Sequence, residues 1–236
     1  MCGRYKYTPA EFADLRIRWN LNGDLPLFKS YNIAPTQSVL VILQKDGRNH
    51  ADLLRWGLVP WWAKDIAIGS QTINARAETL TGKPAFKGLV KDRRCLVFAD
   101  GFYEWRKEGK GKTPMLFKLA SGEPFSFAGL WDTWKKPDGA VLQSFTIVTT
   151  EPNELVKPIH NRMPVILSDS DAKIWLGSDG GDLAHALSLL RPFPDDLMKA
   201  HDVSLLVNNP RNDIAACADP VEESHDGTPQ GLLDLR

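Results

Sequence analysis

Short apolar runs separated by Gly and Pro dominate this chain, and their order constrains its fold more than any other feature. Helical patterns are few, and they do not alternate regularly with these runs as they would in a doubly wound parallel sheet. The sequence therefore predicts an α+β fold with a mainly antiparallel, barrel-like β core flanked by several short helices. The expected strands cover residues 39–43, 53–58, 95–99, 102–105, 115–119, 125–130, 145–149, 165–167 and 203–207.

Four helices are expected around this core. Residues 8–11 read Thr-Pro-Ala-Glu, a capping box with Pro at the first helical position, which predicts a helix over about 9–19. The other three each have a polar N-cap candidate near the start and cover about 168–175, 182–190 and 195–200.

Length and composition bound the organisation of the chain. With 236 residues and 43% hydrophobic residues, it can bury a core without disulfides or metals, and the three cysteines have no paired spacing. We predict a single domain over 1–220, followed by a polar tail over 221–236. Without a signal-like or membrane-spanning apolar run, the expected location is cytoplasmic. Since the net charge is zero, any nucleic-acid site must be local.

The start of the chain carries the most reactive pair of groups. Because Cys2 is small, removal of Met1 is expected, which would leave an amino-terminal cysteine. Its α-amine and thiol could attack an aldehyde together, the nitrogen first and the sulfur closing a five-membered ring. The α-amine, with a pKa of about 8, is partly neutral at neutral pH. A cysteine that merely begins a strand fits the same tetrapeptide, so a base and an orienting group are needed elsewhere.

Two further motifs offer such groups. If residues 72–78 are extended, Asn74 and Arg76 share one face and could line a groove, although a solvated surface strand gives the same pattern. Glu104 lies between aromatic residues in the run 100–105, where burial would raise its pKa and let it donate and recover a proton. A strand whose glutamate faces solvent is the alternative.

Two more motifs combine a cation with a ring. His160 can transfer protons near neutral pH, and Arg162 can make bidentate contact with phosphate, although a lone histidine is more often structural. Trp61 and Trp62 beside Lys64 could stack unpaired bases. A core aromatic cluster is the alternative, and we expect at least one of the two rings to be buried.

Taken together, these motifs closely resemble the SOS-response-associated peptidase family, the abasic-site sensors of single-stranded DNA. The resemblance extends from residue 2 to about residue 210. Six motifs carry it in order: Met1-Cys2-Gly3-Arg4-Tyr5, Tyr31-Asn32-Ile33-Ala34-Pro35-Thr36, Arg55-Trp56-Gly57-Leu58-Val59-Pro60, Ile73-Asn74-Ala75-Arg76-Ala77-Glu78, Gly101-Phe102-Tyr103-Glu104-Trp105 and His160-Asn161-Arg162-Met163-Pro164.

The resemblance implies a protein that links Cys2 covalently to an abasic deoxyribose through a thiazolidine and so protects the lesion. It implies proton transfer by Glu104 and His160, and a positioning role for Asn74. It further implies phosphate contacts and stacking or wedge residues for single-stranded DNA, at Arg4, Arg76, Arg162, Pro35, Trp62 and Trp105. Autopeptidase activity and weak lyase activity at abasic sites also follow as expectations.

Two other functions remain compatible with the sequence. A peptidase or amide hydrolase could use Cys2 as nucleophile, His160 as base and Asn74 as orienting group. A non-catalytic module for single-stranded DNA is the third possibility, and it would retain its function in Cys2→Ser. We expect no cofactor or metal, a monomer, no membrane contact, and abasic single-stranded DNA and replication-fork proteins as partners.

Overall fold

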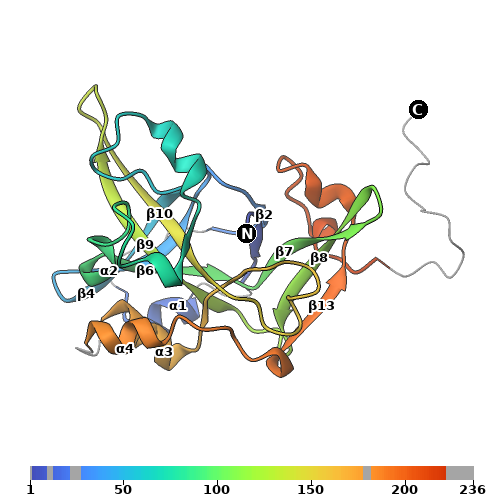
Figure 1. The fold of residues 1–236 in the computed structure, drawn as a ribbon. Helices are drawn as coiled ribbons and strands as arrows, with labels where there is room; N and C mark the ends of the chain where they lie inside the picture. The colour runs from blue at the N-terminus through green and yellow to red at the C-terminus, as the bar shows by residue number, and fades with distance from the viewer. Residues whose placement is uncertain (1, 10–12, 22–27, 178–181, 222–236) are drawn as a thin grey trace, which may run out of the picture.

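The computed structural model describes residues 2–9, 13–21, 28–177 and 182–221. Its strands form an eight-stranded sheet and a five-stranded sheet, and the first described residues, dark blue in Figure 1, lie between them. The predicted α+β class, with a mainly antiparallel barrel-like core and short helices, is confirmed. Among these residues, no helix is long and apolar enough to cross a membrane.

Five strands of the larger sheet close into a barrel. In the order β10-β4-β3-β6-β9 each strand pairs with the next, and β9 pairs again with β10. The β4–β10 pairing is parallel and the others are antiparallel, so the barrel is mixed. These strands are β3 (Ser38–Lys45), β4 (Arg48–Trp56), β6 (Arg94–Ala99), β9 (Phe125–Lys135) and β10 (Val141–Thr150). Three short strands complete the sheet: β5 (Asn74–Arg76) and β11 (Met163–Pro164) pair with β10, and β12 (Ile166–Leu167) pairs with β9.

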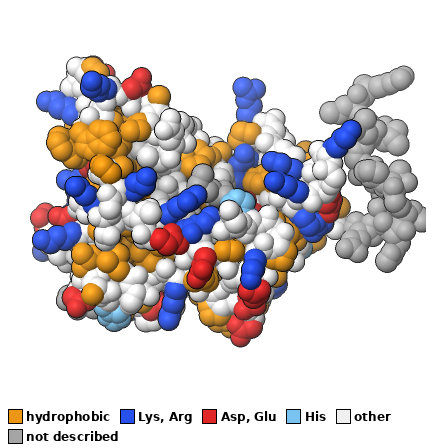
Figure 2. All heavy atoms as spheres, in the orientation of Figure 1, with side chains coloured by type: hydrophobic (Ala, Val, Ile, Leu, Met, Phe, Trp, Pro, Cys, Tyr) orange, Lys and Arg blue, Asp and Glu red, His pale blue; other side chains and the backbone are white. Residues whose placement is uncertain are grey.

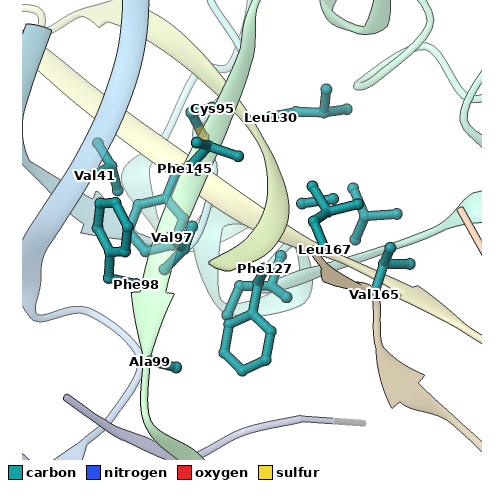
Figure 3. Packing of buried hydrophobic residues seen from close by; sticks show 14 of the residues in the cluster. Val41, Cys95, Val97, Phe98, Ala99, Phe127, Leu130, Phe145, Val165 and Leu167 are labelled. Atoms are coloured by element: carbon teal, nitrogen blue, oxygen red, sulfur yellow. The ribbon is translucent and has the colours of Figure 1, made fainter. Parts of the chain in front are cut away.

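Burial of the barrel strands explains why the sequence predicted strands from the apolar runs. Strand β6 is buried along its whole length, because its side chains face either the barrel interior or the helix packed against the outside. Val97, Phe127 and Phe145 come from three strands and belong to one cluster of buried side chains (Figure 3). Trp175, from the covering helix, donates its indole N–H to the Cys95 carbonyl at 3.1 Å.

The smaller sheet holds the start of the chain. It runs in the order β13-β8-β7-β1-β2 with every pairing antiparallel. Its strands are β1 (Tyr5–Tyr7), β2 (Ser30–Ile33), β7 (Gly101–Glu108), β8 (Gly111–Leu119) and β13 (Met198–Asp202). Tyr5 packs edge-on against Trp56 and Phe127 of the barrel, with ring centroids 5.2 and 5.7 Å apart. The two sheets therefore share a core at β1.

Short helices cover the sheets, and two of the predicted caps are present. The Ser168 hydroxyl accepts the Asp171 N–H at the start of α3, and the Asp182 carboxylate accepts the His185 N–H at the start of α4. The α-helices are α1 (Ala13–Arg18), α2 (Leu89–Asp92), α3 (Asp169–Leu176) and α4 (Leu183–Ser188), and the 3₁₀ helices are η1 (Ile66–Gln71), η2 (Ala77–Thr79), η3 (Asp195–Leu197), η4 (Leu205–Asn208) and η5 (Ala215–Cys217).

Two predicted elements near the carboxyl end are wrong. The helix expected over 195–200 is η3 followed by β13, because residues 198–202 pair with β8. The strand expected over 203–207 is a single bridge at Val203 followed by η4, whose first turn is capped by the Ser204 hydroxyl. Part of the capping box at 8–11 lies outside the described residues, as does the predicted tail beyond Val221. The strands β1, β2, β5, β11 and β13 were not among those predicted.

Candidate thiol site between the two sheets

Pairing between β1 and β7 determines where Cys2 lies. Tyr5 is opposite Phe102, and the Tyr103 N–H donates to the Arg4 carbonyl at 2.9 Å. Continued in the same antiparallel direction, this register brings the residues before Arg4 alongside Glu104. The Cys2 side chain is fully buried, and its thiol donates to the Arg4 carbonyl at 3.8 Å.

The surroundings of Cys2 favour its protonated form. Burial raises the pKa of the thiol well above its usual range, and the charge of Glu104 raises it further. The two side chains are therefore close enough to interact electrostatically. Both effects favour the neutral thiol over the thiolate.

Glu104 is buried at the centre of this site. Its side chain lies in β7 and is only 4% exposed, and burial raises the pKa of the carboxyl group from 4.5 to about 7. A carboxyl group with this pKa exists in both protonation states near neutral pH. It can therefore act as a general acid or a general base.

A cavity of about 660 Å³ opens beside Glu104. It brings Glu104 from β7 together with His160 from the segment that precedes β11. Figure 2 shows basic side chains and a histidine gathered at the centre of one face, where the two sheets meet. The residues that line the cavity are Glu104, Trp105, Lys107, Lys112, Ile159, His160, Asn161 and Asn208.

The orientation of His160 is set by the backbone that follows it. The Arg162 N–H lies 3.0 Å from Nδ1 of the imidazole, and the Arg162 carbonyl oxygen lies 3.1 Å from the same nitrogen. Partial burial is the largest of the effects that lower the pKa of His160. The ring is therefore neutral at neutral pH and can accept a proton.

The larger sheet contributes Asn74 to the candidate site. It begins β5 and lies opposite Ile147 of β10, which buries its side chain to 8% exposure. Its Nδ2 donates to the Ile73 carbonyl at 2.8 Å, whereas the buried Oδ1 accepts no hydrogen bond from the described part of the chain. A buried acceptor without a donor is costly, so Oδ1 is a candidate for a hydrogen bond from a ligand.

Arg162 is held by internal contacts. Its guanidinium forms a bidentate ion pair with Glu78 at 2.8 and 2.9 Å, and it donates to the Thr149 carbonyl at 2.6 Å. These contacts lower the pKa of Glu78. They also tie the His160 segment to β10 and η2, so a phosphate at Arg162 has to compete with Glu78. The sequence did not single out Glu78.

Arg4 likewise bridges parts of the protein. Its Nη1 donates to the Asn32 side chain at 2.8 Å and to the Val207 carbonyl at 2.6 Å, and the guanidinium lies 5.9 Å from the Trp105 ring centroid. The Trp105 indole N–H in turn donates to Asn208 at 2.7 Å. Arg76, at the end of β5, is exposed and open to solvent.

Trp61 and Trp62 lie in a segment that we call the tryptophan loop, residues 57–65. Their side chains are 71% and 45% exposed, so the expectation that at least one is in the core is wrong. The backbone of the loop is fixed instead, since the Trp61 N–H donates to the buried Asp132 carboxylate at 2.9 Å and the Trp134 indole donates to the Ala63 carbonyl at 2.7 Å. Pro35, half-buried, lies in the turn between β2 and β3.

Two glycines hold the base of the tryptophan loop against η1. A Cβ at Gly57 would lie 2.6 Å from the Gly69 carbonyl oxygen, and the φ of Gly57 is +112°. A Cβ at Gly69 would lie 2.8 Å from the Gly57 carbonyl oxygen. Only glycine fits at this close backbone approach.

A buried thiol, a carboxyl group and a histidine between a barrel and an antiparallel sheet define an α+β protein with a candidate thiol-dependent site. The chain belongs to the SOS response associated peptidase family, whose model matches residues 1–210.

Individual proteins agree with this assignment. The chain is 47% identical over 216 residues to the abasic site processing protein YoqW of Bacillus subtilis, covering 90% of this chain and 96% of YoqW. It is 45% identical over 223 residues to the abasic site processing protein YoaM of the same organism, covering 93% and 98%. A crystal structure of a Bacteroides thetaiotaomicron protein has a TM-score of 0.83 at 27% identity, covering 93% of this chain and all of that one.

Proposed function

We propose that this protein processes abasic sites in single-stranded DNA by forming a covalent thiazolidine through Cys2 after Met1 is removed. The observation that carries the proposal is the burial of the Cys2 thiol beside a carboxyl group, Glu104, whose pKa lies near neutrality. The names of the relatives YoqW and YoaM support the lesion as substrate.

The proposed reaction consists of one condensation followed by a ring-closing addition. The neutral α-amine of Cys2 adds to the aldehyde carbon of the ring-opened deoxyribose, and loss of the carbinolamine hydroxyl as water gives an imine. Protonated Glu104 donates the proton that this hydroxyl needs to leave, and its carboxylate then takes the proton of the nitrogen, which leaves a neutral imine. The Cys2 sulfur then bonds to the imine carbon while the thiol proton goes to the nitrogen. The product has the mass of protein plus DNA minus one water.

The other site residues have proposed roles around this reaction. His160, neutral and facing the same cavity as Glu104, acts as a second acid or base in sugar opening and in reversal. The Asn74 Oδ1 accepts a hydrogen bond from the amino terminus or the sugar. Arg76 contacts phosphate directly, whereas Arg4 and Arg162 combine phosphate contact with their internal bonds. Trp62, Trp105 and Pro35 stack on or wedge against unpaired bases.

Peptidase and lyase activity belong to the same proposal as side reactions. The imine makes loss of the 3′ phosphate accessible, because a proton leaves the carbon next to the imine carbon and the C–O bond to the phosphate breaks. Ring closure by sulfur suppresses this elimination. Peptidase activity would cleave the peptide bond that precedes Cys2. Replication-fork proteins as partners, a monomeric state and a cytoplasmic location remain predictions.

The same contacts weigh against a general cysteine hydrolase built on Cys2, His160 and Asn74. Such an enzyme depends on a thiolate, which is normally stabilised by a cation or a histidine. Here burial and the charge of Glu104 both disfavour the thiolate. Addition of a neutral thiol to an imine needs no preformed thiolate.

The test is incubation of the protein, shown by mass to have lost Met1, with a single-stranded oligonucleotide that contains one abasic site. Denaturing electrophoresis and intact mass should show an adduct of protein plus DNA minus water. The adduct should be absent from undamaged DNA and from Cys2→Ala, while Cys217→Ala, which removes another buried thiol, serves as the matched control. An adduct of the same mass on Cys2→Ala would overturn the proposal.

A further inference from the structure

The two faces of the β7–β8 hairpin differ in how their charges are balanced. On one face Arg106 forms a bidentate pair with Asp202 at 2.6 and 3.0 Å, and Glu108 accepts from Arg106 at 2.7 Å and from Thr113 at 2.6 Å. The cation on this face, Arg106, is thus paired with two carboxylates. It is therefore not available to an anionic ligand.

The other face carries two lysines. Lys107 of β7 pairs directly with Lys112 of β8, and both side chains are exposed. Like charges directly opposite each other on a sheet are destabilising. Among the described residues, neither lysine forms an ion pair with an acidic side chain. The hairpin thus keeps an unfavourable concentration of positive charge that an anion would relieve.

The two lysines lie at the candidate site. Both lysines line the cavity that contains Glu104 and His160. Lys107 is two residues after Trp105 in β7, so the two side chains share a face of the strand. The charge of Lys107 also contributes to the lowered pKa of His160, which is consistent with its nearness to the imidazole.

The arginines nearest this cavity are less available. Arg4 donates to Asn32 and to the Val207 carbonyl, and Arg162 is paired with Glu78. A polyanion that reaches Glu104 would therefore find its unpaired cations on the hairpin.

We propose that Lys107 and Lys112 form an anion subsite that binds a phosphodiester of the single strand next to the nucleotide held at Cys2. The inference rests on the proposed function and deepens it, because it assigns the backbone contact of that site. The subsite binds DNA of any sequence, because a contact with phosphate does not depend on the identity of the base. The bound phosphate lies between the two ammonium groups and removes their mutual repulsion.

The experiment measures affinity for an undamaged single-stranded oligonucleotide by fluorescence anisotropy across a range of salt concentrations. The slope of log K against log salt is negative, and each phosphate contact that is lost should reduce its magnitude by about 0.7. Lys107→Gln and Lys112→Gln should each show part of this decrease, and the double variant should show all of it, because both lysines contact the same phosphate. Arginine at both positions should restore the wild-type slope.

Lys110→Gln is the matched control, because Lys110 lies in the turn of the same hairpin, is exposed, and does not line the cavity. It removes the same charge, and its slope should equal that of the wild type. A decrease in Lys110→Gln equal to the other two, or no decrease in any variant, would overturn the subsite. Crosslinking of abasic DNA by the wild type is measured in parallel, because its absence would refute the proposed function, whereas intact crosslinking with unchanged slopes would refute only the subsite.

Discussion

Replacing Glu104 by Gln should stabilise the protein at pH 8 and leave its stability nearly unchanged at pH 4. Glutamine is neutral and has the shape of the protonated acid. The folded pKa, about 7, lies above the unfolded value of 4.5, so the contribution of Glu104 to stability is fully present below about 4.5. It is lost as the pH rises through about 7, because the buried carboxyl group must then ionise.

The magnitude follows from the size of this rise. One pKa unit corresponds to about 1.4 kcal/mol, so the rise from 4.5 to about 7 represents about 3 kcal/mol. Urea unfolding of wild type and Glu104→Gln at pH 4, 6 and 8 measures the difference directly. The variant should gain about 3 kcal/mol relative to wild type across this range. A difference that does not change with pH would refute the argument that burial controls this group.

Glu108→Gln is the matched control on the same strand. Glu108 is exposed, and its hydrogen bonds to Thr113 and Arg106 lower its pKa, so its stabilising effect is present at high pH and is lost as the pH falls. The sign is therefore opposite to that of Glu104. Crosslinking adds a second measurement. The wild-type rate should pass through a maximum between about pH 7 and pH 8, because it needs both protonated Glu104 and a neutral α-amine, whereas Glu104→Gln should be slow and should not fall on the high-pH side.

Three further substitutions test the supports of the site, each by urea unfolding. Gly57→Ala should cost about 3 kcal/mol or more, because the new Cβ would lie 2.6 Å from the Gly69 oxygen at a φ that disfavours side chains. Asp132→Ala should cost about 1–3 kcal/mol and change tryptophan fluorescence, because the Trp61 N–H loses its acceptor. Arg162→Lys should cost about 1 kcal/mol, because lysine cannot keep the bidentate ion pair and the carbonyl bond together.

Strands β3, β6, β9 and β10 were predictable from the sequence because each contains a run of consecutive buried residues, whereas β4 is buried only near its end. The strands of the smaller sheet were harder to predict. β1 has three residues and pairs with β7, about a hundred positions away, and β13 is a polar segment whose strand form depends on β8. Neither pairing leaves a local pattern in the sequence.

Some features of the candidate site could likewise be predicted from the sequence, whereas others could not. The sequence left open whether Glu104 is buried among its aromatic neighbours or faces solvent, and the structure buries it. The exposure of Trp61 and Trp62 could not be expected, because it depends on a buried acceptor, Asp132, that lies far along the chain. Lys107 could have been found from its spacing with Trp105, but Lys112 joins the same cavity only through the hairpin register.

Burial gives Cys2 and Glu104 a common property that bears on the order of the reaction. Burial favours the protonated thiol and leaves the carboxyl group partly protonated near neutral pH. Many cysteine enzymes instead stabilise a thiolate. An amine that attacks first needs a proton donor for the departing water, and the thiol that follows brings its own proton to the nitrogen. If the thiol attacked the aldehyde first, its proton would have to pass to the carbonyl oxygen, which is a weaker base than an imine nitrogen. The electrostatics therefore favour capture by nitrogen before capture by sulfur.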